Sequence, residues 1–416
     1  MRFDTILVGG GLSSLVCGIR LQKKGLKCLI VSAGQNALYF SSGSFDLLGR
    51  LPDGASVSDP LYSMQFLGEN HPYSKIGSER ISGYLDEVIP FFSECGIALH
   101  ALPDVRHNHF RFTPSGSFKA SWLSLNETSM FAEKDSKIEG KALIVNFAGF
   151  LDFNTAFIAE GLERRGATCR VEVVRHPEIE RLRANPTEMR SINIARVMDI
   201  SGNWKEVVSM IKELLHGEDY VVLPEVFGLL NPSVSQWIRE MIPAQVIFVG
   251  TMPPSVPGLR THILLKKRFE ELGGTFLPGD EAKDPVFDGD RLSFIRTANL
   301  GTLKLEADNF VTASGNFFGN GLASTPEKIV EPVFGLDVEY PSDRSQWFSY
   351  RFSDSQNYMS FGVTTDRDFH PCRNGITVPN MYVAGAELGG CNSLAEGSGA
   401  GIAIMTAFCV ADQIKG

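Results

Sequence analysis

The chain begins with a short apolar run, a glycine-rich turn and an amphipathic stretch, followed by a second apolar run. The apolar runs at residues 5–8 and 27–31 predict two strands, and the mixed stretch at 12–23 predicts a helix. This order forms a βαβ unit of about 30 residues. The turn after the first strand therefore lies where a nucleotide-binding loop is expected.

The middle of the chain repeats this alternation of apolar runs and helical stretches, so residues 140–255 predict a second α/β unit. The Pro-rich segment 251–258 is its expected boundary. The expected elements are strands at 142–149, 169–174, 219–228 and within 244–255, a helix from Asp152 as its cap to Arg165, and a helix around Trp237.

The last third returns to the first pattern. A strand within 306–317 ends in Ala-Ser-Gly, which brings the chain back beside the first glycine turn. The other expected elements are a helix at 259–273, strands at 274–279, within 287–297 and at 381–384, and a final helix at 399–414.

Composition describes a soluble globular protein of two or three domains, with 416 residues, 43% hydrophobic and 21% charged. The net charge of −9 argues against a broad nucleic-acid surface. The first strand starts at once, so no signal peptide is expected. The final helix contains Gly401 and Asp412 and is too short to span a bilayer, so any membrane association is expected to be peripheral.

Seven cysteines are scattered without any Cys-x-x-Cys pair. Neighbouring cysteines therefore cannot assemble a zinc site or an iron–sulfur cluster, and no metal is expected. Cys391 lies in a glycine-rich loop and is expected to be the cysteine exposed near a ligand.

The first turn is an altered dinucleotide fingerprint. Gly9 and Gly11 are present, but Ser14 replaces the third glycine and Ser32 replaces the acid that usually ends the second strand. The remaining glycines and the helix N-terminus still form an anion site. A degenerate βαβ unit without any ligand is the alternative.

The order of these pieces resembles the flavoprotein group that includes fumarate reductase and succinate dehydrogenase, over about the first 50 and last 160 residues. Over nearly the whole chain, five segments resemble more narrowly the family formed by the B subunits of anaerobic glycerol-3-phosphate dehydrogenase. These segments are FSSGSFDLL, RFTPSGSFKASWLS, NPTEMRSINIARVMD, FGLDV and FGVTTDRDFHP.

The resemblance and the pattern together predict an α/β fold with a discontinuous Rossmann-like flavin-binding domain and an inserted second α/β domain. The flavin domain is expected to comprise residues 1–75, 256–320 and 375–416. The inserted domain, for substrate or partner, is expected to comprise residues 76–255 and 321–374.

The resemblance implies flavin-dependent oxidation of sn-glycerol 3-phosphate to glycerone phosphate within an anaerobic respiratory complex of glycerol degradation. Electrons would pass to quinone, with fumarate or nitrate as terminal acceptor. The implied partners are an FAD-bearing catalytic subunit and an iron–sulfur subunit that docks on the membrane. The chain would be cytoplasmic, held peripherally on the inner membrane through them. Two alternatives stay open: a non-catalytic electron-relay or assembly subunit, and a separate FAD-dependent reductase of the fumarate reductase kind.

The resemblance implies FMN for this chain, with FAD as the alternative. The usual acid accepts hydrogen bonds from the adenosine ribose of FAD, and Ser32 cannot supply a charge-assisted bond there. A ligand that ends in one phosphate does not need this contact, so the altered fingerprint favours FMN.

Alcohol oxidation by a flavin needs a base for the hydroxyl proton and cations for the substrate phosphate. His370 is the candidate base, and Arg190 and Arg196 are the candidate phosphate ligands. The alternative for His370 is a surface loop histidine, and the alternative for the arginines is an ion pair with the nearby Glu188 or Asp199. Weaker candidates of the same kind are Lys119, Thr364, Thr365 and Asp366.

The candidate flavin ligands lie in four segments rich in glycine and serine, because small residues allow backbone to approach a flat ligand closely. A helix cap at Ser41 or Ser42 and helix packing in the last segment are the alternatives. The candidates are Gly9, Gly10, Gly11, Leu12, Ser13, Ser14 and Ser32; Ser42, Gly43 and Ser44; Gly315; and Gly385, Gly389, Gly390 and Gly399.

Overall fold

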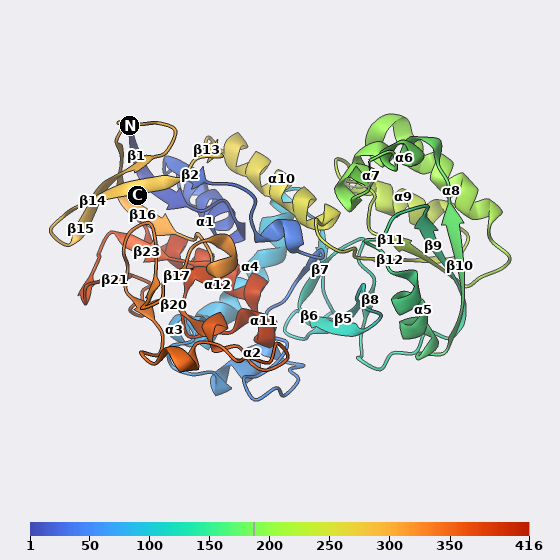
Figure 1. Ribbon diagram of the computed structural model, residues 1–416, viewed down its shortest axis with the longest axis horizontal. Coiled ribbons are helices and arrows are strands. Elements are labelled where there is room, and N and C mark those ends of the chain that lie inside the picture. Colours follow the sequence, from blue (N-terminus) through green and yellow to red (C-terminus); the bar gives the residue numbers. More distant parts are fainter. Residues whose placement is uncertain (186–187, 416) are drawn as a thin grey trace. The chain divides into compact units, whose positions relative to one another are not determined.

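The computed structural model describes residues 1–185 and 188–415 (Figure 1). Positions 186 and 187, which belong to the motif at 185–199, lie outside the described residues. The chain forms two compact units. The first contains residues Met1–Ala37, Phe45–Gly96 and Leu264–Gly416, and the second contains Leu38–Ser44 and Ile97–Ile263.

The first unit is built on a sheet whose parallel strands follow the order β13-β2-β1-β16, with β23 also parallel to β16. Antiparallel strands β15 and β14 extend the sheet beyond β16. The strands are β1 (Arg2–Val8), β2 (Cys28–Ser32), β13 (Thr275–Pro278), β14 (Ala282–Asp288), β15 (Arg291–Thr297), β16 (Leu305–Thr312) and β23 (Met381–Val383).

The predicted βαβ unit is confirmed. Helix α1 (Leu12–Lys23) has the expected ends, and β1 and β2 pair in parallel with Thr5 opposite Cys28. Strand β2 is completely buried, because helices of an α/β fold cover both faces of a parallel sheet. The Rossmann-like fold class predicted from the sequence is therefore confirmed.

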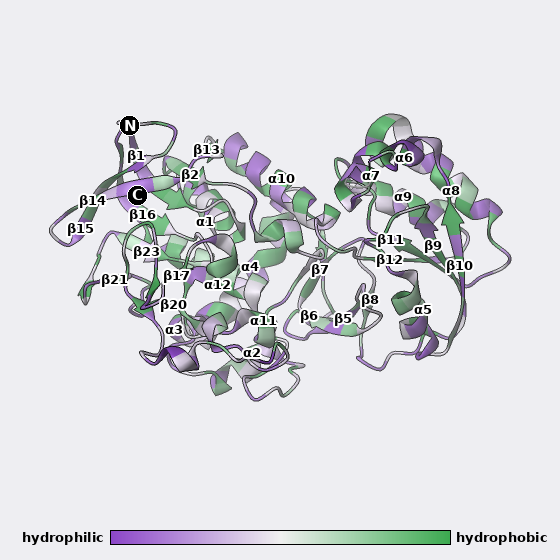
Figure 2. Ribbon diagram, viewed as in Figure 1, coloured by the Kyte–Doolittle hydropathy of each residue, from purple (hydrophilic) through white to green (hydrophobic). Residues whose placement is uncertain are grey.

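The C-terminal helix α12 (Gly399–Gln413) contacts α1 and is buried from Gly401 to Ala411, which explains its almost wholly hydrophobic colour in Figure 2. A helix that is apolar on all sides belongs inside a core. The other helices of this unit are α2 (Pro60–Ser63), α3 (Pro72–Ile76), α4 (Ser78–Glu94) and α11 (Ser393–Glu396).

The second unit contains a parallel sheet in the order β10-β9-β11-β12, which confirms the second α/β unit. Helix α5 lies on one face of this sheet, and α8 and α9 lie on the other (Figure 1). The elements are β9 (Gly140–Phe147), α5 (Thr155–Glu163), β10 (Ala167–Val174), α6 (Pro177–Leu182), α7 (Ser191–Asp199), α8 (Asn203–Glu213), β11 (Tyr220–Pro224), α9 (Ser233–Met241) and β12 (Gln245–Val249).

Several short strands complete the two units. In the second unit, β5 pairs with β6 and β8, and β4 pairs with β7. The short strands are β3 (Ser44–Phe45), β4 (Leu99–His100), β5 (His109–Phe112), β6 (Phe118–Ser121), β7 (Leu123–Leu125), β8 (Met130–Phe131), β17 (Ala323–Ser324), β18 (Ile329–Val330), β19 (Val338–Glu339), β20 (Gly362–Val363), β21 (Cys372–Arg373) and β22 (Ile376–Thr377).

Two local expectations are wrong. The stretch after Ser42 is not helical but enters the two-residue strand β3, so neither Ser41 nor Ser42 caps a helix. Asp152 does not cap α5, because Asn154 accepts hydrogen bonds from the first backbone N–H groups of that helix.

The compact units differ from the ranges expected for the domains. Residues 76–96 belong to the first unit because α4 packs on α12, with Phe91 and Phe408 in edge-to-face contact. Residues 321–374 also belong there, since a bridge joins Val363 to Leu388. The chain passes between the units at residues 263 and 264, inside α10 (Val256–Glu271).

The hairpin tip at Gly116 contacts α5, and this contact leaves no room for a side chain at Gly161 of that helix. A Cβ atom at Gly161 of α5 would lie 2.1 Å from the Gly116 carbonyl oxygen. We expect Gly161→Ala to destabilise the protein by about 1–3 kcal/mol in denaturant unfolding. Gly83→Ala on α4, where a Cβ atom meets nothing within 4 Å, is the matched control and should be neutral or stabilising.

Candidate functional site

The carboxyl ends of the parallel strands in the first unit carry turns that approach one another closely. At Gly9, with φ +109°, a Cβ atom would lie 2.3 Å from the Ala313 carbonyl oxygen that follows β16. At Gly10, a Cβ atom would lie 2.1 Å from Ser32 Oγ. The packing of the fold therefore requires glycine at these two positions, whether or not a ligand binds at this edge.

Gly11 differs from its two neighbours, because a Cβ atom there would meet only Asn36 Cβ, at 3.8 Å. Gly11 is the N-cap of α1, no side chain caps the helix, and the first turn holds no acidic residue. The first backbone N–H groups of α1 therefore have no side-chain cap and suit an anion such as a phosphate. The absent side chain of Gly11 leaves room for that anion.

Two further members of the predicted fingerprint lie inside the protein. Ser13 and Ser14 are buried in the first turn of α1, and Leu12 is its first residue. Ser32 is also buried, and its hydroxyl donates to the Gly34 carbonyl at 3.3 Å. The side chain at the usual acid position thus faces Gly10 rather than solvent.

The predicted glycines of the last segment follow β23 and also contact protein. A Cβ atom would lie 2.1 Å from Ser13 Oγ at Gly385 and 2.6 Å from the Asn70 carbonyl oxygen at Gly390. Gly389 packs against the backbone of Gly362. Packing contacts within the protein thus explain why these three positions are glycine. They do not explain the fourth predicted glycine of this segment, Gly399.

That fourth glycine, Gly399, is the first residue of α12, where a Cβ atom would meet only Ser393, at 3.8 Å. Gly315 follows β16 with φ +93°, and its carbonyl oxygen would lie 1.9 Å from a Cβ atom at Gly321. The turns after β1, β16 and β23 thus share one edge of one sheet.

Glu387 was missed by the sequence reasoning and lies at this edge. Its carboxylate accepts hydrogen bonds from Thr312 Oγ1 at 2.9 Å and from the Ser314 backbone N–H at 2.7 Å. Burial and the neighbouring Glu331 carboxyl raise the pKa of Glu387 to about 8. A lone acid in the apolar run YVAGAELGG was the signal for it.

A second buried polar cluster begins α12. His71 Nε2 lies 3.1 Å from Glu396 Oε2, and the Ser398 hydroxyl donates to the same oxygen at 2.9 Å. The backbone N–H of Tyr73 donates to His71 Nδ1, so the histidine donates to Glu396 through Nε2. Burial raises the pKa of Glu396, but hydrogen bonds and charge from His71 outweigh it and the pKa falls below its usual range.

His370 lies beside the first residues of β23, whereas the glycine loop follows the last residue of that strand. Its Nδ1 is 2.8 Å from the Met381 carbonyl oxygen, and its ring packs on Tyr382. Nearby, Lys75 donates to the Thr365 hydroxyl at 2.9 Å. The Val383 backbone N–H donates to the carbonyl oxygen of Phe369, so His370 lies along the three-residue strand β23, and its role as a base stays a prediction.

Arg190, Arg196 and the segment with Ser42, Gly43 and Ser44 belong to the second unit or its edge. Arg190 precedes α7 and pairs with Asp152, whereas Arg196 contacts Asn193. The Ser42 and Ser44 hydroxyls lie 3.4 Å apart, and the Gly43 carbonyl accepts from the Leu125 backbone. Arg190 thus lies before α7 and Arg196 within it, and their roles as phosphate ligands stay predictions.

Cys391 is buried, so the expectation that it is exposed near a ligand is wrong. Its thiol donates to the carbonyl oxygen of Leu388 within the same loop. Burial raises the pKa of this thiol and of those of Cys17, Cys28, Cys95 and Cys409 above the usual range.

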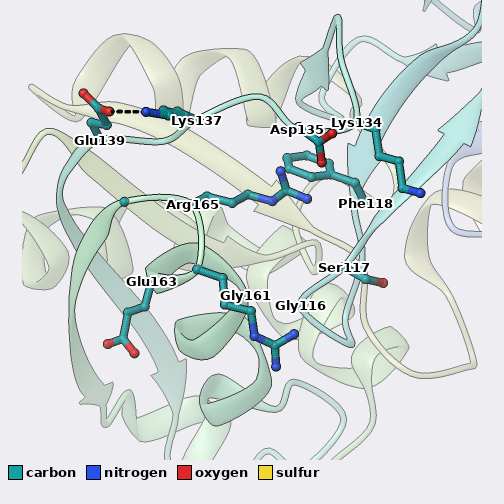
Figure 3. Close-up of a pocket in the computed structure, with 12 residues that line it drawn as sticks. Gly116, Ser117, Phe118, Lys134, Asp135, Lys137, Glu139, Gly161, Glu163 and Arg165 are labelled. Carbon is teal, nitrogen blue, oxygen red and sulfur yellow. Dashed lines mark ion pairs between the residues drawn. The ribbon is translucent and has the colours of Figure 1, made fainter.

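A cavity of about 630 Å³ lies in the second unit and is lined by Gly116, Ser117 and Phe118, which directly precede the candidate Lys119 (Figure 3). Arg165 extends over the ring of Phe118, 3.6 Å from its centroid. Lys137 pairs with Glu139, and Arg164 pairs with Glu160. Its cations are largely paired within the protein, so it is not our candidate site.

Within residues 1–185 and 188–415, no group of three or more His, Cys, Asp or Glu side chains is placed to hold a metal ion. No helix there combines the length and the apolar character that crossing a membrane requires.

Comparison with known proteins identifies the class of protein to which the chain belongs. Residues 4–402 match the family model described as FAD binding domain, which defines a flavin-binding protein. Proteins named as the B subunit of anaerobic glycerol-3-phosphate dehydrogenase match over 100% of this chain. That of Pectobacterium carotovorum subsp. carotovorum (strain PC1) is 40% identical over 99% of its length, that of Yersinia enterocolitica 38% over 98%, and that of Actinobacillus succinogenes 35% over 99%. The chain belongs to this family of B subunits.

The open space at Gly11 yields a first test of the flavin site. We expect Gly11→Val to lower flavin occupancy at least tenfold, because the new side chain fills the space in front of the α1 N–H groups. Flavin absorbance per protein of the purified chain measures the effect. Gly83→Val should retain its flavin, and a yellow Gly11→Val protein would place the flavin elsewhere.

The buried Glu387 yields a test of stability against pH. Its pKa is raised in the folded state to about 8, so the folded protein keeps a proton that the unfolded chain releases above its ordinary pKa of 4.5. Stability therefore falls as pH rises from about 4.5 to 8. We expect Glu387→Gln to remove up to about 1.4 kcal/mol per pH unit of this slope in urea unfolding. Glu281→Gln, at an exposed position, should leave the slope unchanged.

Proposed function

We propose that this chain is the flavin subunit of a complex that oxidises sn-glycerol 3-phosphate to glycerone phosphate and passes the electrons to quinone. Full-length identity of 35–40% to proteins named as the B subunit of anaerobic glycerol-3-phosphate dehydrogenase supports this activity. The single structural observation behind it is the uncapped, unobstructed N-terminus of α1 at Gly11.

We propose FMN as the flavin. Support comes from the second strand: Ser32 is buried against Gly10 and offers no carboxylate to an adenosine ribose. The phosphate of FMN would be held by the N–H groups of α1 beyond Gly11. FAD, named in the description of the matching family, is the alternative that the experiment below separates.

The bound flavin would supply the chemistry of hydride acceptance. The residues of this chain then have separate tasks. The turn at Gly9–Gly11 would bind the phosphate, and the N-terminus of α12 at Gly399 would favour negative charge on a reduced ring. Glu387 and the Glu396–His71 pair hold the surrounding turns in place through buried hydrogen bonds.

We propose that the partners are an FAD-bearing catalytic subunit and an iron–sulfur subunit that docks on the membrane, with fumarate or nitrate as terminal acceptor. The chain would work on the cytoplasmic face of the inner membrane through these partners. The naming of the relatives as B subunits supports an assembly of several chains.

A relay role is the second candidate, in which the flavin passes electrons between partners without contacting substrate. One observation favours it: His370, the candidate base, is held by protein groups, with Nδ1 2.8 Å from the Met381 carbonyl oxygen and its ring packed on Tyr382. In this case His370→Ala would retain full turnover in the assembled complex.

The deciding experiment releases the flavin with acid, identifies it by chromatography, and follows flavin absorbance after anaerobic addition of sn-glycerol 3-phosphate. We expect FMN, bleached by substrate in the purified chain. Bleaching only after the partner subunits are added would establish the relay role. Released FAD would contradict the cofactor proposal, and a flavin that never bleaches in the complex would contradict the activity.

A further inference from the structure

Three exposed aromatic side chains belong to one loop of the first unit. This aromatic loop, residues 348–357, contains Phe348, Tyr350 and Phe352. Tyr350 is 96% exposed and Phe352 99%, and the rings of Phe348 and Tyr350 meet edge to face with centroids 5.1 Å apart. At about 200 Å² for one aromatic side chain, the three expose roughly 500 Å². That is more than half of the roughly 800 Å² that each partner buries in a stable protein complex.

The side chain of Gln356 ties the backbone of the aromatic loop together. Its Oε1 accepts a hydrogen bond from the Ser349 backbone N–H at 3.0 Å, and its Nε2 donates to the carbonyl oxygens of Ser349, Arg351 and Asp354 at 3.0–3.3 Å. The Ser349 hydroxyl also donates to the Asp354 carboxylate at 2.7 Å. A surface that is ordered before binding loses less conformational entropy when a partner binds. The loop thus presents its exposed rings on an ordered backbone.

The base of the aromatic loop is anchored in the first unit. Trp347, which precedes the loop, is buried in an apolar cluster with Ile329 and Phe361. Its carbonyl oxygen accepts a hydrogen bond from the Tyr358 backbone N–H at 2.9 Å. The Tyr358 ring packs edge to face on Phe317, which lies in the turn after β16. Packed side chains therefore connect the loop to one of the turns of the candidate flavin edge.

The composition of the aromatic loop favours a protein partner over a membrane surface. The loop contains one arginine, one aspartate, and no lysine or glutamate, so its net charge is zero. Anionic lipid headgroups attract clusters of lysine and arginine, and the loop has no such cluster. Protein interfaces are enriched in aromatic residues and arginine and depleted in lysine and glutamate, as this loop is.

Arg351 places a positive charge between the two most exposed rings. The residue is exposed, and within the described part of the chain it forms no ion pair with a carboxylate. Tyrosine and arginine are among the residues that contribute most to binding at interfaces. A guanidinium between two rings is complementary to an apolar pocket with a carboxylate beside it.

We propose that the aromatic loop docks another subunit of the same complex, which receives Tyr350 and Phe352 in an apolar pocket and places a carboxylate opposite Arg351. The proposal deepens the proposed function and rests on it for the identity of the partner, because the relatives are named as B subunits. A subunit docked here is held by the unit that carries the candidate flavin edge.

The test measures binding of the purified FAD-bearing subunit and, separately, of the purified iron–sulfur subunit to the immobilised, flavin-loaded chain. We expect at least one of them to bind. The double variant Tyr350→Ser/Phe352→Ser should weaken that binding at least tenfold, because it removes both aromatic anchors. Arg351→Glu should also weaken it at least tenfold, by bringing two negative charges together.

Gln356→Ala tests whether the order of the loop matters. This variant leaves the rings and Arg351 in place but removes the hydrogen bonds that tie the loop backbone together. We expect it to weaken partner binding about three- to tenfold, the cost of ordering one or two side chains on binding.

The matched control is Tyr62→Ser/Phe66→Ser, which removes another exposed tyrosine and phenylalanine in contact, in the same unit. It should bind the partner as the wild type does. Flavin absorbance per protein and thermal unfolding should be unchanged in both double variants, because the rings that they remove are exposed.

Four results would overturn the docking surface. One is wild-type affinity in Tyr350→Ser/Phe352→Ser, and another is an equal loss of affinity in the control. A third is a dimer of the wild-type chain in analytical sedimentation that the double variant abolishes, since a second copy would then occupy the loop. The fourth is binding of the wild type, but not of the double variant, to vesicles of phosphatidylethanolamine and phosphatidylglycerol.

These results are distinguishable from a failure of the proposed activity, which flavin bleaching reports. Selective loss of binding in the double variant, together with a complex whose flavin sn-glycerol 3-phosphate never bleaches, would support the surface and overturn the activity. Bleaching by substrate together with wild-type affinity in the double variant would overturn the surface alone. A wild-type chain that binds neither subunit would overturn both the surface and the proposed partners.

Discussion

The first unit depends on the close approach of backbone segments at one edge of its sheet. The turn at Gly9 contacts the carbonyl of Ala313, and Gly385 contacts Ser13, although these partners are hundreds of positions apart in the sequence. Side chains at these glycines would push the turns apart. Because the turns meet, the N-terminus of α1 lies at a fixed place in the sheet edge, with its N–H groups uncapped.

The elements that the sequence predicted correctly are those with a strong local pattern. Helix α1 and strand β2 follow one another within a single βαβ unit, and α12 is apolar on every side. The short strands β3 to β8 were not predicted, because strands of two to four residues are too short to show a period. Asp152 and Asn154 are both good caps, and only the tertiary position of the preceding loop decides between them.

The candidate site was predicted only in part, for a related reason. The glycines of the first turn belong to a fingerprint with fixed spacing, so the sequence reveals them. Glu387 and Glu396 were missed because their importance comes from burial and from partners distant in sequence. Glu387 interrupts an apolar run near the end of a strand, and that pattern was available in the sequence.

The burial of most of the cysteines affects how their thiols react with oxygen. The thiolate is the form that oxidants attack, and burial holds five of the seven thiols protonated and out of reach of solvent. These five side chains are therefore poor targets for oxidation to sulfenic acids or for cross-linking. In the isolated chain, thiol oxidation by air should begin at the two partly exposed thiols, Cys169 and Cys372.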